Sequence, residues 1–353
     1  MIKRILYTLL IMFPVVASAQ INTDRVMAIG RNALYFEDYV LSIQYFNQVI
    51  NAKPYLSDPY FYRGLAKINL DDFQGAESDC SEAIERNPFV VSAYQVRGLA
   101  RIQQNNFAGA IEDYTKALEF DPENIGVWHN MALCRIRQED YKGAKNDLDK
   151  LIAISPRYTK AYLMRGEVDL KQKDTLAAEK DFGKAIEIDR YDADTWASRA
   201  ILRLQQQRYK DAEADFDHAI RLSTRNSGVY INRALARYHQ NNLRGAMSDY
   251  DIALDIDPNN FIGHYNRGLL RAQVGDDNRA IQDFNFVIEM EPDNMMAIFN
   301  RGLLLDQTGD YKGAIKDYST VINEYPNFLL GYQYRAQARR KIGDVKGADA
   351  DEF

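Results

Sequence analysis

The chain has 353 residues, of which 46% are hydrophobic and 27% charged, and it holds twenty glycines, nine prolines and two cysteines. A chain of this composition can bury a large core, which excludes collagen-like, disordered and disulfide-scaffold proteins. The formal net charge of -6 at pH 7 gives no field that would attract a phosphate backbone, so we expect no nucleic-acid partner.

The N-terminal segment combines a basic start with a short apolar stretch. Lys3 and Arg4 precede an apolar run that Pro14 interrupts, and an Ala-Ser-Ala tripeptide ending at Ala19 follows. This order is typical of a secretory signal peptide, and the apolar run is too short to span a membrane comfortably. We therefore expect cleavage of residues 1–19, no membrane insertion afterwards, and an exported protein that is periplasmic or secreted. No cysteine lies near the cut, so a lipid anchor is not expected.

A repeat of 34 residues runs through the rest of the chain. Seven of the nine prolines follow this period, and Arg190 and Thr224 stand where it lacks a proline. These prolines, with Arg190 and Thr224, mark one position in each repeat. A glycine or alanine stands ten residues after every marked position, and an alanine stands twelve residues before every marked position except the first. Small residues at fixed places, flanked by apolar residues at helical spacing, suit two antiparallel helices that approach closely. The periodic prolines are Pro54, Pro88, Pro122, Pro156, Pro258, Pro292 and Pro326.

Aromatic side chains recur at two positions of the repeat, one on each expected helix. At this spacing they fill a continuous core rather than hold a cofactor, so we expect no cofactor. Proline lacks the N–H that a helix interior needs, and it therefore separates the second helix of one repeat from the first helix of the next. The aromatics of the second helices are Phe46, Tyr114, Phe182, Phe216, Tyr250, Phe284 and Tyr318.

The order of these positions resembles the tetratricopeptide repeat (TPR) family, whose 34-residue helix-turn-helix unit carries an aromatic, a small residue, an alanine, a second aromatic and a proline. The resemblance implies an all-α fold, a right-handed superhelical solenoid of antiparallel helix pairs whose first helices line a concave groove. It covers residues 20–353. We expect nine full repeats and a partial tenth, with the bounds 23–56, 57–90, 91–124, 125–158, 159–192, 193–226, 227–260, 261–294, 295–328 and 329–353.

The chain stops at Phe353, inside the second helix of the tenth repeat. Solenoid ends need a polar cap, so we expect the sequence to continue in a longer protein. This leaves open a docking or sensing arm whose catalytic or signalling domain lies beyond residue 353. It also leaves open self-association through the uncapped end.

The two cysteines, Cys80 and Cys134, stand 54 residues apart, which is more than one repeat. Stacked repeats then hold their Cα atoms farther apart than the roughly 7 Å that a disulfide allows. Export favours disulfides in general, but here we expect two buried free thiols.

A charged pattern accompanies the small residues. An arginine precedes the small residue of most first helices, and an aspartate follows it sixteen positions later, as in Arg267 and Asp283. One interpretation is an arginine ladder for phosphates or acidic ligands. The other is structural pairing within each repeat, which we favour because the first repeat lacks both partners together. The fourth repeat has Met131 with Asp147, and Arg135 could substitute there.

The residues before three of these arginines predict a ligand-binding surface. In repeats seven to nine, an apolar residue and an asparagine stand directly before the arginine. The TPR superhelix of the O-linked N-acetylglucosamine transferases is similar at this repeat position, where its asparagines hold the backbone of an extended peptide. A carboxamide both donates to and accepts from a peptide group. The alternative is that the asparagines brace neighbouring repeats. The candidate residues are Ile231, Asn232, Tyr265, Asn266, Phe299 and Asn300, with Gln273 and Gln307 extending the polar lining.

No group of residues in the sequence has the spacing of a catalytic or metal site. The histidines at positions 129, 218, 239 and 264 occupy four different places in the repeat, so no two of them are expected to converge. We therefore expect a scaffold that binds a protein or an extended peptide in its concave groove, and not an enzyme.

Overall fold

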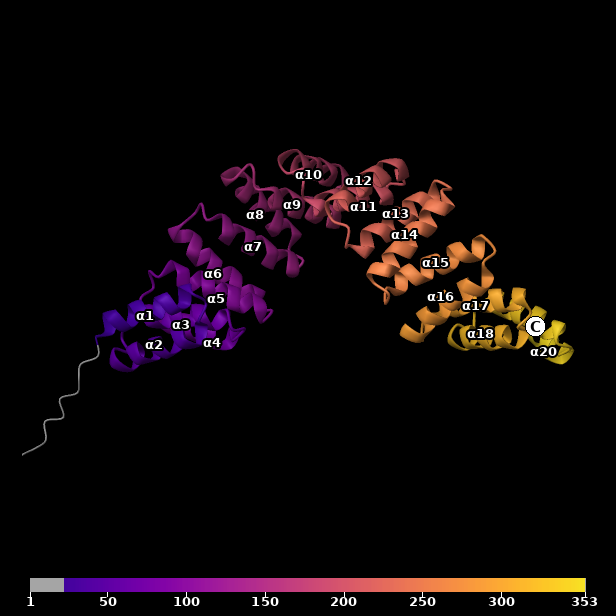
Figure 1. Ribbon diagram of the computed structural model, residues 1–353, viewed down its shortest axis with the longest axis horizontal. Coiled ribbons are helices and arrows are strands. Elements are labelled where there is room, and N and C mark those ends of the chain that lie inside the picture. Colours follow the sequence, from indigo (N-terminus) through magenta and orange to yellow (C-terminus); the bar gives the residue numbers. More distant parts are fainter. Residues whose placement is uncertain (1–21, 353) are drawn as a thin grey trace, which may run out of the picture. The chain divides into compact units, whose positions relative to one another are not determined.

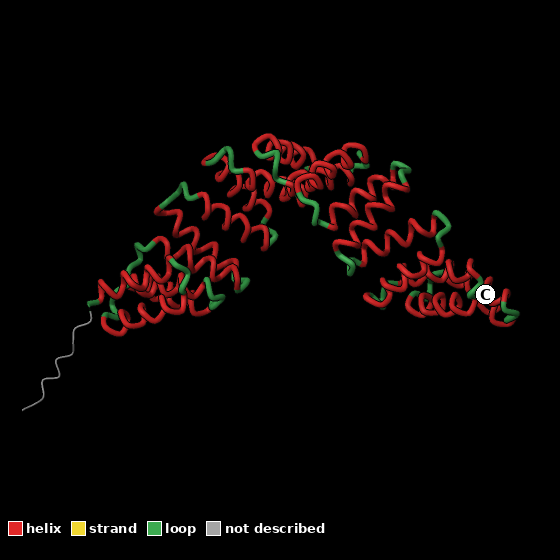
Figure 2. The backbone as a smooth tube through the Cα atoms, viewed as in Figure 1, coloured by secondary structure: helices red, strands yellow, loops and turns green. Residues whose placement is uncertain are grey.

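The computed structural model describes residues 22–352, and these form twenty α-helices without any β-strand (Figure 1). Figure 2 shows the short loops that join them. Each odd-numbered helix packs against the even-numbered helix that follows it, which confirms the all-α solenoid of helix pairs. None of the described helices is long and apolar enough to cross a membrane. The expected signal peptide, residues 1–19, lies outside the described part of the chain.

The chain divides after Tyr158 into two compact units. The helices of the first unit are α1 (Thr23–Tyr35), α2 (Tyr39–Ala52), α3 (Asp58–Ile68), α4 (Phe73–Arg86), α5 (Val91–Gln103), α6 (Phe107–Phe120), α7 (Ile125–Arg137) and α8 (Tyr141–Ile154).

The second unit begins at Thr159 and continues the same alternation of first and second helices. Its helices are α9 (Thr159–Lys171), α10 (Thr175–Ile188), α11 (Ala193–Gln205), α12 (Tyr209–Leu222), α13 (Ser227–His239), α14 (Leu243–Ile256), α15 (Phe261–Gln273), α16 (Asp277–Met290), α17 (Met295–Thr308), α18 (Tyr311–Glu324), α19 (Leu329–Lys341) and α20 (Val345–Asp351).

The turn between the two helices of a repeat has the same backbone conformation throughout the described chain. One residue in each turn has a positive φ, for example Asp71 at 59° and Gly309 at 95°. The residue after it directly precedes the second helix, and in most repeats its side chain caps that helix. Asp72, for instance, accepts a hydrogen bond of 2.9 Å from the backbone N–H of Gly75. The cap satisfies a helix donor that has no partner within the helix.

The small residues lie where the paired helices are closest. A Cβ atom built on Gly166 would lie 2.6 Å from the ring of Phe182, and one built on Gly302 would lie 2.9 Å from the ring of Tyr318. The aromatic rings of the second helices therefore occupy the space that a larger residue would need. Phe182 and Tyr318 are both fully buried, as the periodic pattern predicts for a continuous core.

Both cysteines are buried and free, as expected from their spacing. Burial raises the pKa of the Cys80 thiol to about 12 and that of the Cys134 thiol to about 11. Because the thiolate is the reactive form, both side chains act as small apolar residues at neutral pH.

Candidate functional site

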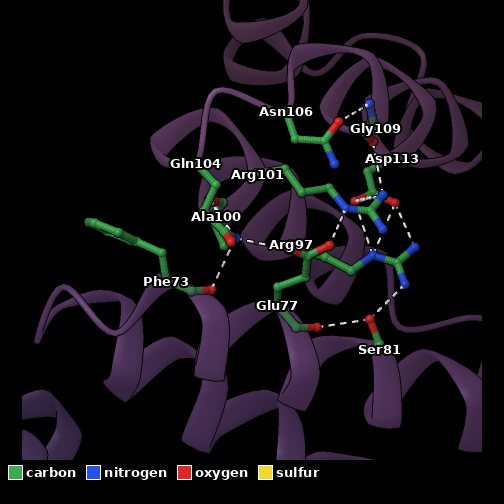
Figure 3. Close-up of polar contacts among 10 residues, drawn as sticks. All are labelled: Phe73, Glu77, Ser81, Arg97, Ala100, Arg101, Gln104, Asn106, Gly109 and Asp113. Carbon is green, nitrogen blue, oxygen red and sulfur yellow. Dashed lines mark hydrogen bonds and ion pairs between the residues drawn. The ribbon is translucent and has the colours of Figure 1, made fainter.

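The arginines that precede the small residues are held by aspartates of their own repeats. Figure 3 shows this arrangement in the third repeat, where Arg97 donates to the two carboxylate oxygens of Asp113 from Nε at 3.0 Å and from Nη2 at 2.6 Å. Arg267 is bound to Asp283 in the same manner, at 3.1 and 2.8 Å. The carboxylates of these pairs are almost fully buried, with Asp113 and Asp283 each 2% exposed. This confirms the structural interpretation, because arginines held in this way are not free to form a ligand ladder.

A second basic residue, one helical turn later, strengthens most of these pairs. In the third repeat Arg101 donates from Nη1 to Asp113 at 3.0 Å and from Nε to Glu77 at 2.8 Å (Figure 3). In the fourth repeat the first arginine is absent, and the Nε of Arg135 lies 3.1 Å from Oδ2 of Asp147, as expected. That oxygen has no hydrogen-bond partner in the described part of the chain, so the contact is an ion pair without hydrogen-bond alignment.

The same arginines also join neighbouring repeats. The Nη1 atom of Arg97 donates to Ser81 at 3.1 Å, and that of Arg301 donates to Asn285 at 2.8 Å, in each case on the second helix of the preceding repeat. Each such arginine therefore fixes its own helix pair and its stacking on the preceding pair. The first helices are consequently rigid supports for the residues beside the arginines.

Two of the three candidate asparagines have no internal hydrogen-bond partner in the described chain. Asn232 on α13 and Asn266 on α15 are partly exposed, and their carboxamides form no hydrogen bond with other described residues. Asn300 on α17 differs, because its Nδ2 donates to the hydroxyl of Tyr265 at 3.2 Å. Tyr265 stands thirty-five residues before Asn300, and the residue at the same distance before Asn266 is Ile231, whose side chain has no hydrogen-bond acceptor. Bracing of a neighbouring repeat therefore holds for Asn300, and two amides stay available to a ligand.

The apolar neighbours of the asparagines differ in accessibility. Ile231 is only 7% exposed and belongs to the core around α13 and α14, so its side chain is not available to a ligand. Tyr265 is partly buried, with its ring 5.8 Å from that of Phe284. Burial raises the pKa of the Tyr265 hydroxyl, and the hydrogen bond from Asn300 acts in the opposite direction. Phe299 is also partly buried, with its ring 5.1 Å from that of Phe328.

The two glutamines lie at the far ends of these helices. Gln273 and Gln307 are both exposed, near the C-termini of α15 and α17. Their contribution to a polar lining stays a prediction.

An apolar pocket of about 370 Å³ lies at the start of α17, and we refer to it as the α17 pocket. Of its lining residues, only Phe299 belongs to the ligand-binding surface that the sequence predicted. The adjacent methionines Met295 and Met296 were the feature of the sequence that could have indicated this pocket. In the structure, the side chain of Met296 is 62% exposed. The lining residues are Asp293, Asn294, Met295, Met296, Phe299, Val321, Tyr325 and Phe328.

The histidines do not converge. His218 stacks on Trp196 with ring centroids 4.2 Å apart, and His264 stacks on Phe286 at 4.1 Å. Within residues 22–352, no group of three or more histidine, cysteine, aspartate or glutamate side chains has the arrangement of a metal site.

The repeats match models of known families. The TPR repeat model matches residues 98–134, and tetratricopeptide repeat models match 125–158, 159–192, 198–261 and 265–327. The chain belongs to the tetratricopeptide repeat family. Solenoids of this kind present extended surfaces to other proteins, so this TPR chain is a scaffold for protein interactions.

Solved structures of other TPR proteins share its fold. A tetratricopeptide repeat protein from Parabacteroides merdae is 21% identical, with 70% of this chain and 98% of that protein aligned at a TM-score of 0.54. The C-terminal part of a TPR repeat-containing protein from Cytophaga hutchinsonii is 17% identical, with 67% and 97% aligned at 0.55. The pilF protein of Pseudomonas aeruginosa is 18% identical, with 60% and 97% aligned at 0.55. No curated protein sequence matches the chain.

Proposed function

We propose that this TPR protein binds an extended peptide along the first helices of repeats seven to nine. The observation that carries the proposal is the pair of partly exposed amides, Asn232 and Asn266, which occupy the same repeat position and form no hydrogen bond with the other residues of the 22–352 range. Each carboxamide can donate to a peptide carbonyl and accept from a peptide N–H, whatever side chains the peptide carries.

The two amides lie on the first helices of consecutive repeats. Asn232 is on α13 and Asn266 is on α15, one repeat of 34 residues later. An extended peptide that crosses both helices would therefore meet an amide on each of them. The Arg–Asp pairs stabilise this surface, because Arg233 and Arg267, next to the two asparagines, are each bonded to an aspartate.

Replacing both free asparagines tests the proposal. The double variant Asn232→Ala, Asn266→Ala should keep its helicity and lose about 1–3 kcal/mol of binding free energy, which is roughly a 5- to 150-fold loss of affinity. Binding is measured by fluorescence anisotropy with labelled peptides selected from a random library on the wild-type protein. Asn300→Ala is made separately, because loss of its bond to Tyr265 changes stability as well.

A matched control uses asparagines on the second helices. Asn278 on α16 and Asn323 on α18 are exposed and form no hydrogen bond with other described residues. Their double replacement by alanine should leave peptide affinity unchanged. Equal affinity in the wild type and the Asn232→Ala, Asn266→Ala variant would contradict the proposal.

We also propose that the protein is exported. Support comes from the sequence of residues 1–19, with Lys3 and Arg4 before an apolar run and a small-residue tripeptide ending at Ala19. Mass spectrometry of the protein expressed in a bacterial host should find Gln20 at the N-terminus. An intact N-terminal segment in the mature protein would contradict cleavage.

A further inference from the structure

The α17 pocket adjoins the proposed peptide path. Phe299 lines the pocket, and the next residue, Asn300, reaches back to Tyr265 on the preceding first helix. A peptide that follows the first helices of repeats seven to nine therefore arrives at this pocket. A volume of about 370 Å³ is small for a whole ligand, and it suits one large side chain of a longer one.

Apolar side chains are exposed in the pocket and in the segment that follows Phe328. Met296 is 62% exposed and Tyr325 55% exposed, and the two residues after Phe328, Leu329 and Leu330, are 79% and 51% exposed. Contiguous apolar surface with polar edges marks sites of interaction. Methionine adapts its shape to a partner, because its side chain is unbranched and polarizable.

The segments that form the pocket carry only acidic charges. Residues 289–299 contain Glu289, Glu291 and Asp293, residues 321–328 contain Glu324, and neither segment contains a lysine, arginine or histidine. Asp293 lines the pocket and is exposed. A basic side chain beside the pocket is therefore favoured, and an anionic membrane surface is disfavoured.

We propose that the α17 pocket holds an apolar side chain of the bound peptide and that Asp293 contacts a lysine or arginine next to it. The ligands are then peptides in which a large apolar residue has a basic neighbour. This inference rests on the proposed function, because it assumes a peptide on the first helices. It adds the class of peptide, which the amides alone do not select.

Four pools of fluorescein-labelled nine-residue peptides test the class of ligand with the full chain. Their central residue is Phe or Ser, its neighbours are both Lys or both Glu, and the other positions vary among small polar residues. The pool with Phe and Lys should bind about tenfold more tightly than the pool with Ser and Lys. It should bind about threefold more tightly than the pool with Phe and Glu at low salt, and this second difference should shrink in 0.5 M NaCl.

Two surface variants assign the preferences to residues. Met296→Ser should reduce the preference for Phe over Ser, and Asp293→Lys should remove or invert the preference for Lys over Glu. Their controls are Met290→Ser, at the end of α16, and Asp255→Lys, on α14. Both control residues are exposed and neither lines the pocket, so both preferences should stay as in the wild type.

The outcomes separate this inference from the proposed function. Equal binding of the Phe and Ser pools, or of the Lys and Glu pools, overturns the inference, and the groove still stands if Asn232→Ala, Asn266→Ala weakens binding. Unchanged affinity in that double variant overturns the groove, and the inference falls with it, because it assumes a peptide on the first helices. Absence of binding by every pool overturns both. A concentration-dependent dimer that Met296→Ser abolishes would place a second copy of the chain in the pocket, which also overturns the inference.

Discussion

Asp147 is a buried carboxylate that lacks the bidentate arginine of the equivalent aspartates in other repeats. Burial raises its pKa to about 6 from an ordinary value of 3.8, and the ion pair with Arg135 offsets only part of this effect. The equivalent Asp113 accepts hydrogen bonds from both Arg97 and Arg101. Methionine at position 131, where most other repeats have arginine, therefore leaves the fourth repeat with a destabilising charge near neutral pH.

Replacement of this carboxylate by an amide should depend on pH. Because the folded state holds the proton of Asp147 more tightly than the unfolded state, its unfavourable contribution is fully present above about pH 6 and disappears as the pH falls towards 3.8. Asp147→Asn should raise the thermal midpoint by about 2 °C at pH 8, and the gain should vanish near pH 4. Circular dichroism melts across this range measure the difference.

Asp113→Asn is the matched control, because it removes an acceptor that two arginines use. It should lower the midpoint at pH 8, because it weakens the ion pairs of the buried Asp113 with Arg97 and Arg101. A loss of stability in Asp147→Asn equal to that of Asp113→Asn would show that the Arg135 contact is a full substitute for the missing arginine.

At the scale of a helix, backbone conformation decides where a glycine can be replaced by alanine. Gly183 lies inside α10, and a Cβ atom built there would meet no atom within 4 Å. Gly309 has equally open surroundings, but it ends α17 with a φ of 95°. Available space is thus the same at the two positions, and only the backbone differs.

The same substitution should consequently have opposite effects at these two glycines. Gly183→Ala should stabilise the protein by about 1 kcal/mol, since alanine loses less backbone entropy in a helix. Gly309→Ala should destabilise it by about 1 kcal/mol, because side chains other than hydrogen are disfavoured at positive φ. Urea titrations followed by circular dichroism measure both. Effects of the same sign would mean that α17 ends differently in solution.

At the scale of the whole molecule, stability in a repeat protein is local. Each repeat contacts mainly its neighbours, so a substitution should affect its own region most. The two tryptophans, Trp128 and Trp196, lie one in each compact unit, and both free cysteines lie in the first. The protein therefore carries separate natural probes of its two units.

Arg267→Met should show this locality. The change removes two hydrogen bonds to the buried Asp283, which keeps Arg271 and His264 as partners, so we expect a loss of about 1–3 kcal/mol. In a Trp128→Phe background, the fluorescence of Trp196 should report a lower urea midpoint. Labelling of the buried Cys80 and Cys134 by a thiol reagent reports unfolding of the first unit, and its urea midpoint should be the same as in the protein with Arg267. Equal shifts in both probes would indicate global unfolding.

The repeat pattern was sufficient to predict the helix pairs, the buried free thiols and the Arg–Asp pairs. Each depends on spacing along the chain: two residues sixteen positions apart, on antiparallel helices of one repeat, meet in every repeat that contains both. Arg135 could be assigned to Asp147 for the same reason, since one helical turn brings it alongside.

The candidate site was only partly predictable. Periodicity identified Asn232, Asn266 and Asn300 as equivalent positions, but it did not show that Asn300 alone meets a hydroxyl, which depends on Tyr265 in the preceding repeat. It also placed Ile231 beside a ligand, whereas the stacked helices bury it. Equivalent positions of the repeats have the same backbone conformation, but the contacts of their side chains depend on which residues the neighbouring repeats carry.

The sequence by itself determined the family, the length of the repeat and the residues that pair within it, because these follow from a period that local helix geometry imposes. Only the tertiary structure decided which polar groups stay free and where apolar surface is exposed. The α17 pocket illustrates the difference, since Met296 comes from α17, whereas Tyr325 and Phe328 come from the loop between α18 and α19. Packing brings such residues together, and packing depends on side chains from neighbouring repeats that no single period encodes.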